Sequence, residues 1–358
     1  MRAIFASPLN ALLVAAPASW VLHASAPESP WSFMTAALSL VPLAGLIGLA
    51  TEQLAHRSGP AFGGLLNATF GNAAEMIIAV VALGEGHVGL VKASITGSIV
   101  GNLLLVLGLS FFIGGLGRKT QKFHRTAATN MAAMLFLAVV ALVMPAVFDL
   151  SLYGTLKARP PAIDRLSLWS AAILILAYAG SLVYAFTAHR DLFRSETHGE
   201  TKAALSTGVA LGLLATATVL TTIQAEILVA TLQPALVRFG FTELFVGVIV
   251  VAVIGNAAEH YSALVAARRD QMTLAVEIAV GSSAQIALLV APLVVLYSFA
   301  IGRPMSLLFD PFEIAAIALS VLATGLVVGD GESNWVEGIQ LMAVYLILAL
   351  AFYLVPVG

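Results

Sequence analysis

The stretch Asn67-Ala68-Thr69-Phe70-Gly71-Asn72-Ala73-Ala74-Glu75 places a carboxylate inside an apolar run that continues to Ala82. Its last five residues return as Gly255-Asn256-Ala257-Ala258-Glu259, again after an apolar run. A charged side chain at the centre of a membrane span costs roughly 2.5–3.5 kcal/mol on insertion scales. Each glutamate lies well inside its run, where a side chain does not easily reach water. We therefore interpret Glu75 and Glu259 as functional residues rather than as helix-end residues that reach the lipid headgroups.

The composition is that of a polytopic membrane protein. Of the 358 residues, 60% are hydrophobic and 10% are charged, whereas soluble proteins carry about 25% charged residues. The mean hydropathy is +0.98. A net charge of −2 gives no indication of nucleic-acid binding, and the sequence contains no cysteine for disulfides or thiolate metal sites. A metal ion would need oxygen ligands, and no cofactor is expected.

Apolar stretches of roughly 20 residues predict an all-α protein with about eleven transmembrane helices. The expected ranges are 8–24, 32–56, 61–83, 88–115, 127–148, 167–188, 203–232, 241–267, 272–300, 309–328 and 336–356. For the first range the alternative is a cleaved signal peptide, residues 1–26, which ends at Ala24-Ser25-Ala26. We favour a helix there.

Lysine and arginine are concentrated in the loops on one side of these expected helices. Because cytoplasmic loops carry an excess of Lys and Arg, the bias predicts a cytoplasmic N-terminus and a C-terminus outside. The short loops favour a prokaryotic inner (plasma) membrane. The lipid bilayer is thus the expected surrounding of the chain.

The repeated motif belongs to a longer internal duplication. The offset in the sequence that carries Gly71 onto Gly255, called the repeat offset below, also carries Gly97-Ser98 onto Gly281-Ser282. An odd number of expected helices, five, separates the third helix from the eighth, so the two copies enter the membrane in opposite directions. This is an inverted 5+5 repeat. The expected organisation is an extra N-terminal helix (1–28), a first repeat of helices 2–6 (29–190), a cytoplasmic linker (191–202) and a second repeat of helices 7–11 (203–358).

The motif residues offer only oxygen ligands. Asn and Glu lie three residues apart in each copy, so they share one face of a helix. The glycines weaken the helix and can free backbone carbonyls. Such a hard site suits Ca²⁺ rather than Zn²⁺ or Cu²⁺. The expected cation ligands are Glu75, Glu259, Asn72, Asn256, Gly71 and Gly255.

The two glutamates are also the expected proton carriers. Two carboxylates close together in a low dielectric do not both stay ionised cheaply. Without a cation, one or both should hold a proton, whereas bound Ca²⁺ requires both to be charged. Cation and protons then compete for one site, which is the minimum chemistry of an antiporter.

Further polar residues occur inside the expected spans and are candidates to line the ion pathway. The alternatives are interfacial helix ends for the acidic residues and ordinary interhelical hydrogen bonds for Ser and Asn. His260 points about 100° away from Glu259 on a helix, so we assign it to packing or pH tuning rather than to the ligand set. The pathway candidates are Glu52, Gln53, Gln224, Glu226, Ser98, Asn102, Ser282, Ser283, Gln285 and Glu277.

The chain resembles the Ca²⁺/H⁺ antiporters, the cation/proton exchangers of the calcium/cation antiporter superfamily. The segments Gly63–Glu75 and Gly97–Gly108 look like the first signature repeat, and Gly255–His260 and Gly281–Leu288 look like the second. The resemblance implies eleven helices, a cation site at the two motif glutamates, and sliding of helices 2 and 7 as the gating motion. It also implies exchange of Ca²⁺ for H⁺. One departure is the weakly acidic linker 191–202, which puts Ca²⁺ sensing by that segment in doubt.

Four alternatives stay open beside the Ca²⁺/H⁺ antiporter. The nearest are an exchanger of the same fold for Mn²⁺ and a Na⁺-coupled Ca²⁺ exchanger, although Gly-Asn-Ala-Ala-Glu favours protons over Na⁺. An intramembrane protease would need two membrane aspartates, but Asp330 lies in a stretch typical of a loop and the sequence has no His-Glu-x-x-His motif. A passive channel suits a neutralised charge pair less well than exchange does. We expect a transporter and not an enzyme.

Overall fold

The computed structural model describes residues 8–58, 63, 66–67, 69–154, 161–187 and 205–356. Its contacts divide the chain into two compact units: residues 1–94, 196–259 and 355–358 form unit 1, and residues 95–195 and 260–354 form unit 2. Each unit combines segments from both halves of the sequence. The predicted linker 191–202 lies outside the described residues.

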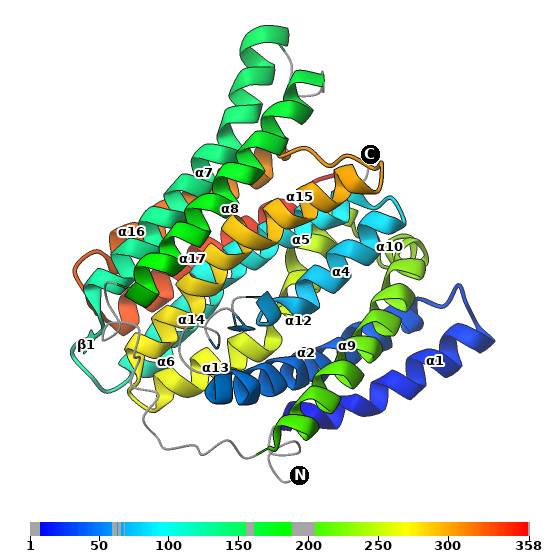
Figure 1. The fold of residues 1–358 in the computed structure, drawn as a ribbon, viewed down its shortest axis with the longest axis horizontal. Coiled ribbons are helices and arrows are strands. Elements are labelled where there is room, and N and C mark those ends of the chain that lie inside the picture. The colour runs from blue at the N-terminus through cyan, green and yellow to red at the C-terminus, as the bar shows by residue number, and fades with distance from the viewer. Residues whose placement is uncertain are drawn as a thin grey trace. The chain divides into compact units, whose positions relative to one another are not determined.

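Unit 1 is built around the long helix α2 (Pro30–Ser58), which packs lengthwise on α9 (Thr207–Ala230) (Figure 1). Both α1 and α4 pack against this pair. The other elements of unit 1 are η1 (Pro8–Val14, a 3-10 helix), α1 (Ala15–Ser25), α4 (Ala73–Gly84), α10 (Leu232–Phe239), α11 (Glu243–Phe245), η3 (Val246–Val251, a π-helix) and α12 (Ala252–Gly255).

An apolar cluster holds the first motif against this helix pair. Ala73 of α4 packs against Ile47 of α2 and Ala217 of α9, and Phe70 and Ile77 extend the same cluster. The small side chains at 73 and 217 let the helices approach closely, which is how helices associate in a bilayer. The cluster fixes the position of the first turn of α4, which contains Glu75.

Unit 2 contains two long helical spans that carry the segments following the motifs. Helices α5 (Val88–Val100), η2 (Gly101–Val106) and α6 (Leu107–Gly115) form one span, and α14 (Met272–Gln285), η4 (Ile286–Val290) and α15 (Ala291–Ala300) form the other. The first turns of α5, through Ser94, belong to unit 1. Both η2 and η4 are π-helical, so each span contains one wide turn.

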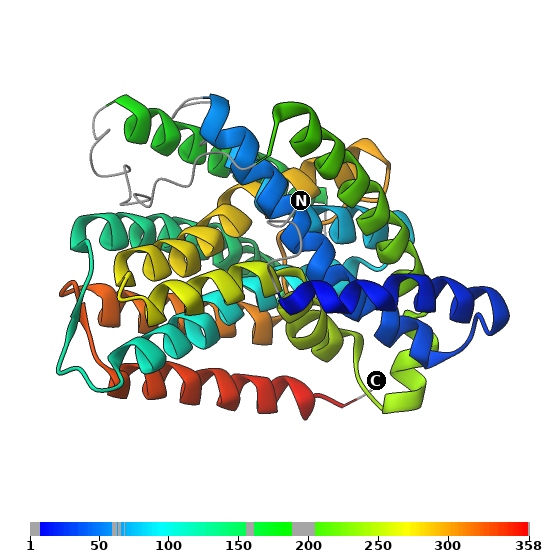
Figure 2. The ribbon, with the colours of Figure 1, turned by 90° about the horizontal axis from the view of Figure 1, so that it is seen from below.

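Four more helices complete unit 2. The helices α7 (Arg125–Tyr153) and α8 (Pro161–Thr187) lie side by side (Figure 1), and α14 and α16 (Pro311–Val328) both pack on α7. Helix α17 (Trp335–Tyr353), red in Figure 2, packs on α6. Most of α13 (Ala257–Arg268) also belongs to unit 2.

The helix ends in unit 2 are capped by side chains that the sequence supplies. Asp310 and Glu313 form a capping box at the start of α16, and Asn334 and Glu337 form another at the start of α17. Each box satisfies backbone N–H groups that the first helical turn leaves unpaired. A two-residue antiparallel pairing joins β1 (Gln121–Lys122) to β2 (Glu332–Ser333). Asp330 lies in the turn before β2, as predicted.

Eight helices in the described part of the chain are long and apolar enough to cross a membrane. A ninth span exists if α10 and the segment Glu243–Gly255, which meet at 109°, are taken together. The predicted spans 88–115 and 272–300 have these same bounds in the structure. The predicted helix 61–83 lies partly outside the described residues, and its described part contains the short apolar helix α4.

Two predicted helices were wrong in their continuity, because the described part of 61–83 also leaves helical geometry, at Gly71 and Asn72. The sequence predicts a single helix over 241–267, but the chain leaves helical geometry at Asn256, between α12 and α13. The amide of Asn256 donates to the carbonyl of Ala252 at 2.9 Å. The backbone N–H of Asn256 donates to the same carbonyl at 3.1 Å, so the side chain adds a local bond at the point where the helix ends. Hydropathy does not detect a bond of this kind.

The repeat offset that relates the motifs also relates several helices. It carries the bounds of α4, 73–84, onto those of α13, 257–268, and the start of α5 at Val88 onto the start of α14 at Met272. The π-helical segments η2 and η4 overlap under the same offset. Local structure therefore repeats together with the sequence.

Candidate functional site

Both copies of the motif lie at an interruption between two helices. Asn72 immediately precedes α4, with φ −100° and ψ 26°, and Asn256 separates α12 from α13, with φ −92° and ψ 8°. These angles lie in the sparsely populated bridge region, which is frequent at functional sites. Both asparagines are fully buried. The site is thus built on two interrupted helices.

The interruption places each glutamate in the first turn of a new helix. Glu75 is in the first turn of α4 and Glu259 is in the first turn of α13. The partial positive charge of a helix N-terminus favours a carboxylate there. Immediately before the second break, α12 ends at Gly255, and helix ends of this kind provide carbonyl groups that coordinate cations in transporters. Carboxylate, amide and carbonyl oxygens therefore lie within a few residues of one another in the second copy.

The two copies meet where Glu75 lies against Gly255. A methyl group on Gly255 would be 3.4 Å from Cγ of Glu75 and 3.5 Å from its Oε1. Helix α2 also passes the second copy, because a methyl group on Gly45 would lie 3.8 Å from Cβ of Ala258. Of the predicted ligands, the structure therefore brings Glu75 of the first copy against Gly255 of the second, within unit 1.

The Glu75 carboxylate is buried, and no described residue donates a hydrogen bond to it. Neither of its oxygens has appreciable accessible surface, and neither has a hydrogen-bond partner among the residues that the structure describes. Leaving an ionised carboxylate in this state is costly. Such a group needs a cation or a proton, so an orphaned carboxylate beside Gly255 is the strongest sign of a ligand site in the fold.

Within unit 2, the residue after Glu259 is held by a polar network. His260 Nε2 lies 3.1 Å from Oδ1 of Asn102, and Nδ2 of Asn102 donates to Oγ of Ser282 at 3.3 Å. Asn102 and Ser282 are pathway candidates, and both are buried. Sequence reasoning missed this role for His260, because the pairing partner lies 158 residues away. The only feature of the sequence that could have indicated the pair is that the two apolar segments containing His260 and Asn102 each carry a polar residue.

The remaining pathway candidates of unit 2 lie on the two long spans. Ser98 is buried on α5, and the hydroxyl of Ser283 on α14 donates to the carbonyl of Ala279 at 2.9 Å. Glu277 and Gln285 lie on α14, two turns apart, and both are partly buried. Their predicted role in the pathway stays a prediction.

The four pathway candidates of unit 1 divide into two kinds. Gln53 accepts a bond from the backbone N–H of Leu205 at 3.2 Å, and Gln224 accepts one from the Ser19 hydroxyl at 2.7 Å. These buried amides therefore join α2 and α9 to neighbouring segments. Glu52 and Glu226 are exposed, and Glu52 pairs with His56 at 3.6 Å. Lining of the ion path by these four residues stays a prediction.

The described residues contain no group of three or more acidic, histidine or cysteine side chains that could hold a metal ion. The two motif copies together contain two carboxylates and otherwise neutral oxygen donors. That donor set fits a transiently bound hard cation better than a permanent transition-metal centre.

Comparison with known proteins identifies the family of the chain. A family model described as sodium/calcium exchanger protein matches residues 28–187 and 209–354, which include both motifs. The chain belongs to this family. This exchanger is 43% identical over 327 residues to the Ca²⁺/H⁺ antiporter ChaA of Bacillus subtilis (strain 168), an alignment that covers 90% of the chain and 92% of ChaA. It is 41% identical over 340 residues to the Ca²⁺/H⁺ antiporter of Aphanothece halophytica, with 91% and 90% covered.

Solved structures agree with this assignment to the exchanger family. Native YfkE superimposes with a TM-score of 0.83 at 39% identity, covering 97% of this chain and all of YfkE. The H⁺/Ca²⁺ exchanger CAX superimposes with a TM-score of 0.73 at 16% identity, covering 96% and 91%, and this match supports the fold alone. The resemblance expected from the sequence is confirmed, and the exchanger is an integral membrane protein with bacterial relatives.

Proposed function

We propose that this exchanger is a secondary active antiporter that carries Ca²⁺ in one direction and H⁺ in the other. The single observation that carries the proposal is the buried carboxylate of Glu75 against Gly255 of the second motif. Relatives named Ca²⁺/H⁺ antiporters, at 41% and 43% identity over most of the chain, support the choice of ions. Neither a cofactor nor an enzymatic step enters this function.

The exchange follows from competition at Glu75 and Glu259. When the cation is bound, both carboxylates are ionised and coordinate it together with oxygens of Asn72, Asn256, Gly71 and Gly255. When the cation leaves, burial makes two ionised carboxylates too costly, and protons take its place. The site is then occupied and close to neutral in both states, which lowers the barrier to its movement across a low dielectric.

The inverted 5+5 repeat supplies the mechanism of access. We infer that helices 2–6 and 7–11 form the two repeats of an eleven-helix protein, with the extra helix at residues 1–28. The agreement of helix bounds under the repeat offset supports the duplication. In transporters with inverted repeats, the substrate site lies near the midplane and the two repeats rock to open it alternately. Helices 2 and 7, which contain α2 and α9, are the proposed gating pair.

The proposed location is a prokaryotic inner membrane, with the N-terminus in the cytoplasm and the C-terminus outside. The excess of Lys and Arg on one side supports this orientation. A thiol-reactive probe at single cysteines placed in the loops 117–124 and 301–310 tests it, because the chain has no native cysteine to interfere. Labelling of the second loop alone by an impermeant probe in intact cells is expected.

The deciding experiment is Ca²⁺ uptake into proteoliposomes with an imposed pH gradient, compared with a Na⁺ gradient and with no gradient. We expect uptake with the pH gradient, and we expect an uncoupler to abolish it. Uptake with the Na⁺ gradient alone would instead assign the chain to Na⁺-coupled exchange, and gradient-independent flux would indicate a channel. Competition by Mn²⁺ in the same assay tests the alternative cation.

A further inference from the structure

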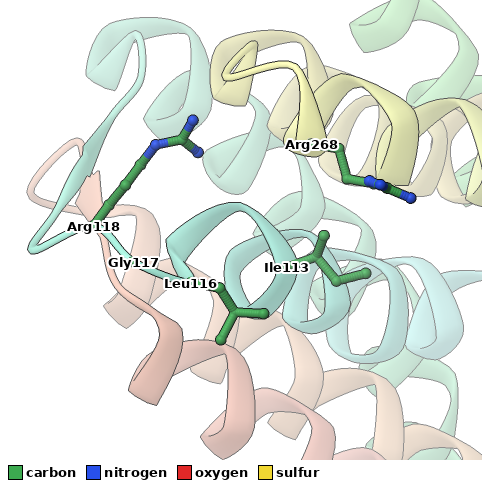
Figure 3. A pocket seen from close by; sticks show the side chains of 5 residues that line it. All are labelled: Ile113, Leu116, Gly117, Arg118 and Arg268. Carbon is green, nitrogen blue, oxygen red and sulfur yellow. The ribbon is translucent and has the colours of Figure 1, made fainter.

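A pocket that contains none of the motif residues opens where two helices of unit 2 end. It has a volume of about 580 Å³ and is lined by Ile113, Leu116, Gly117, Arg118 and Arg268 (Figure 3). The side chains of Arg118 and Arg268 extend from opposite sides of it, and those of Ile113 and Leu116 lie between them (Figure 3). The lining of the pocket therefore combines two cationic side chains with two apolar ones, Ile113 and Leu116.

The pocket lies at the end of a membrane span. The span Val88–Gly115 ends immediately before Leu116, and α13 ends at Arg268. Leu116 is 57% exposed although it is a large apolar residue. At a span end such a side chain meets the boundary between acyl chains and headgroups, where cationic side chains attract anionic lipids. We propose that this pocket binds the phosphate group of an anionic phospholipid.

Arg118 is held at the pocket, and part of its guanidinium has no hydrogen-bond partner among the described residues. Its Nη1 donates to the carbonyl of Gly114 at 2.6 Å and lies 3.4 Å from Oδ1 of Asp270. A guanidinium has five N–H donors, and the structure gives no partner for Nε or Nη2 within the residues it describes. The Gly114 bond fixes the arginine at the end of α6. Its outer edge therefore stays available for a phosphate oxygen, the ligand that the arginine fork suits best.

Arg268 supplies the second positive charge. Its side chain is exposed, and no ion pair of its guanidinium occurs among the described residues. Lys119 and Arg269 are also exposed nearby, whereas Asp270 is the single acidic residue of the adjacent turn. Positive charge is therefore in excess here, and it lies on the side of the membrane that the sequence predicts to be cytoplasmic.

The test measures lipid binding to the full chain in a neutral detergent, so it does not depend on the proposed exchange activity. Short-chain phosphatidylglycerol is titrated against phosphatidylcholine of the same chain length. We expect the anionic lipid to bind more tightly, and Arg268→Gln to weaken its binding about five-fold or more. Arg269→Gln is the matched control, because it removes the same charge one residue outside the pocket. Its effect should stay below about two-fold.

A second variant changes binding in the opposite direction. Asp270→Asn removes the charge that competes for Arg118, and binding of phosphatidylglycerol should tighten about five-fold. The backbone of Asp270 is left-handed, with φ 64°, a conformation that asparagine also tolerates. This variant should therefore fold normally, and the thermal unfolding midpoint checks that it does.

Three results would overturn the proposal. Equal losses in Arg268→Gln and Arg269→Gln would mean that diffuse surface charge, not the pocket, attracts the lipid. Unchanged binding in Asp270→Asn would remove Arg118 from the site. Competition by glycerol phosphate at the concentration of the lipid would mean that the pocket binds a soluble phosphate instead of a membrane component.

Discussion

The two copies of the Gly-Asn-Ala-Ala-Glu motif contain the same five residues in different surroundings. After Glu75, helix α4 continues with Met76, Ile77 and Ile78, and Ile77 packs against the apolar cluster of unit 1. After Glu259, helix α13 continues with His260, Tyr261 and Ser262, and His260 is paired with Asn102. One copy is thus apolar next to its carboxylate and the other is polar.

This difference teaches that the repeated sequence keeps the predicted ligands but not the residues around them. Under the repeat offset His260 corresponds to Met76 and Asn102 corresponds to Ile286, so the two polar residues that pair in unit 2 both have apolar counterparts. Ser98 and Ser282, in contrast, correspond to each other. The glutamates should therefore be equally essential, while substitutions around them should have unequal effects.

The largest expected effect is the loss of either carboxylate. Glu75→Gln and Glu259→Gln should each reduce Ca²⁺ transport more than about 100-fold, because losing even an outer partner of a metal ligand typically costs about 10–100-fold. Both variants should still insert and fold, since Gln preserves the shape of the side chain. Transport in proteoliposomes measures the effect, and the elution profile in detergent is the control. Retained transport in one variant would mean that the copies are not equivalent as ligands.

The second effect is on cation affinity as the pH changes. Because protons and Ca²⁺ share the carboxylates, the affinity for Ca²⁺ should fall as the pH is lowered, by about ten-fold per unit for each proton displaced. Equilibrium binding of ⁴⁵Ca²⁺ between pH 6 and pH 8 measures this slope. A slope near one proton would indicate that only one copy exchanges its proton. An affinity independent of pH would contradict direct competition.

The contact between the copies predicts a smaller effect. Gly255→Ala places a methyl group in van der Waals contact with the Glu75 side chain, 3.4 Å from Cγ and 3.5 Å from Oε1. The methyl group takes up space beside the carboxylate that a bound cation needs, and should weaken Ca²⁺ binding about ten-fold. Gly48→Ala on α2 is the matched control, because a methyl group there meets no atom within 4 Å. Gly71→Ala differs from both, since its methyl group would collide with the backbone oxygen of Asn67. Unchanged binding in Gly255→Ala would separate Glu75 from the second copy.

The smallest expected effect is on stability, at Asn102 and at the position that the repeat offset relates to it. Asn102→Ala leaves His260 and the hydroxyl of Ser282 without their shared amide, and should lower the free energy of unfolding by about 1–3 kcal/mol. Ile286→Val, at the corresponding position, should cost about 0.5–1.5 kcal/mol. Thermal unfolding in detergent compares the two variants. A larger loss of unfolding free energy in Ile286→Val would mean that the polar network of Asn102 contributes less to stability than the apolar packing at the corresponding position.

Much of this arrangement was accessible from the sequence, and the rest was not, for physical reasons. Hydropathy located the spans 88–115 and 272–300 because long apolar runs leave little choice in a bilayer. It overlooked the break at Asn256 inside an otherwise apolar run, where the side-chain amide and the backbone N–H both donate to the carbonyl of Ala252. It also could not pair His260 with Asn102, because the contact depends on tertiary packing. The motif predicted the ligands, and that prediction did not include the contact of Glu75 with Gly255, which the fold creates.

The π-helical turns η2 and η4 have a consequence for how the chain tolerates changes in length. A π-turn contains one residue more than an α-helix needs to connect the same two ends. Deleting one residue from Gly101–Val106 or from Ile286–Val290 would therefore tighten the turn and leave the flanking helices facing their present neighbours. The same deletion in α5 or α14 would rotate everything beyond it by about 100°. These two turns are thus the positions at which the long spans can shorten by one residue without losing their packing.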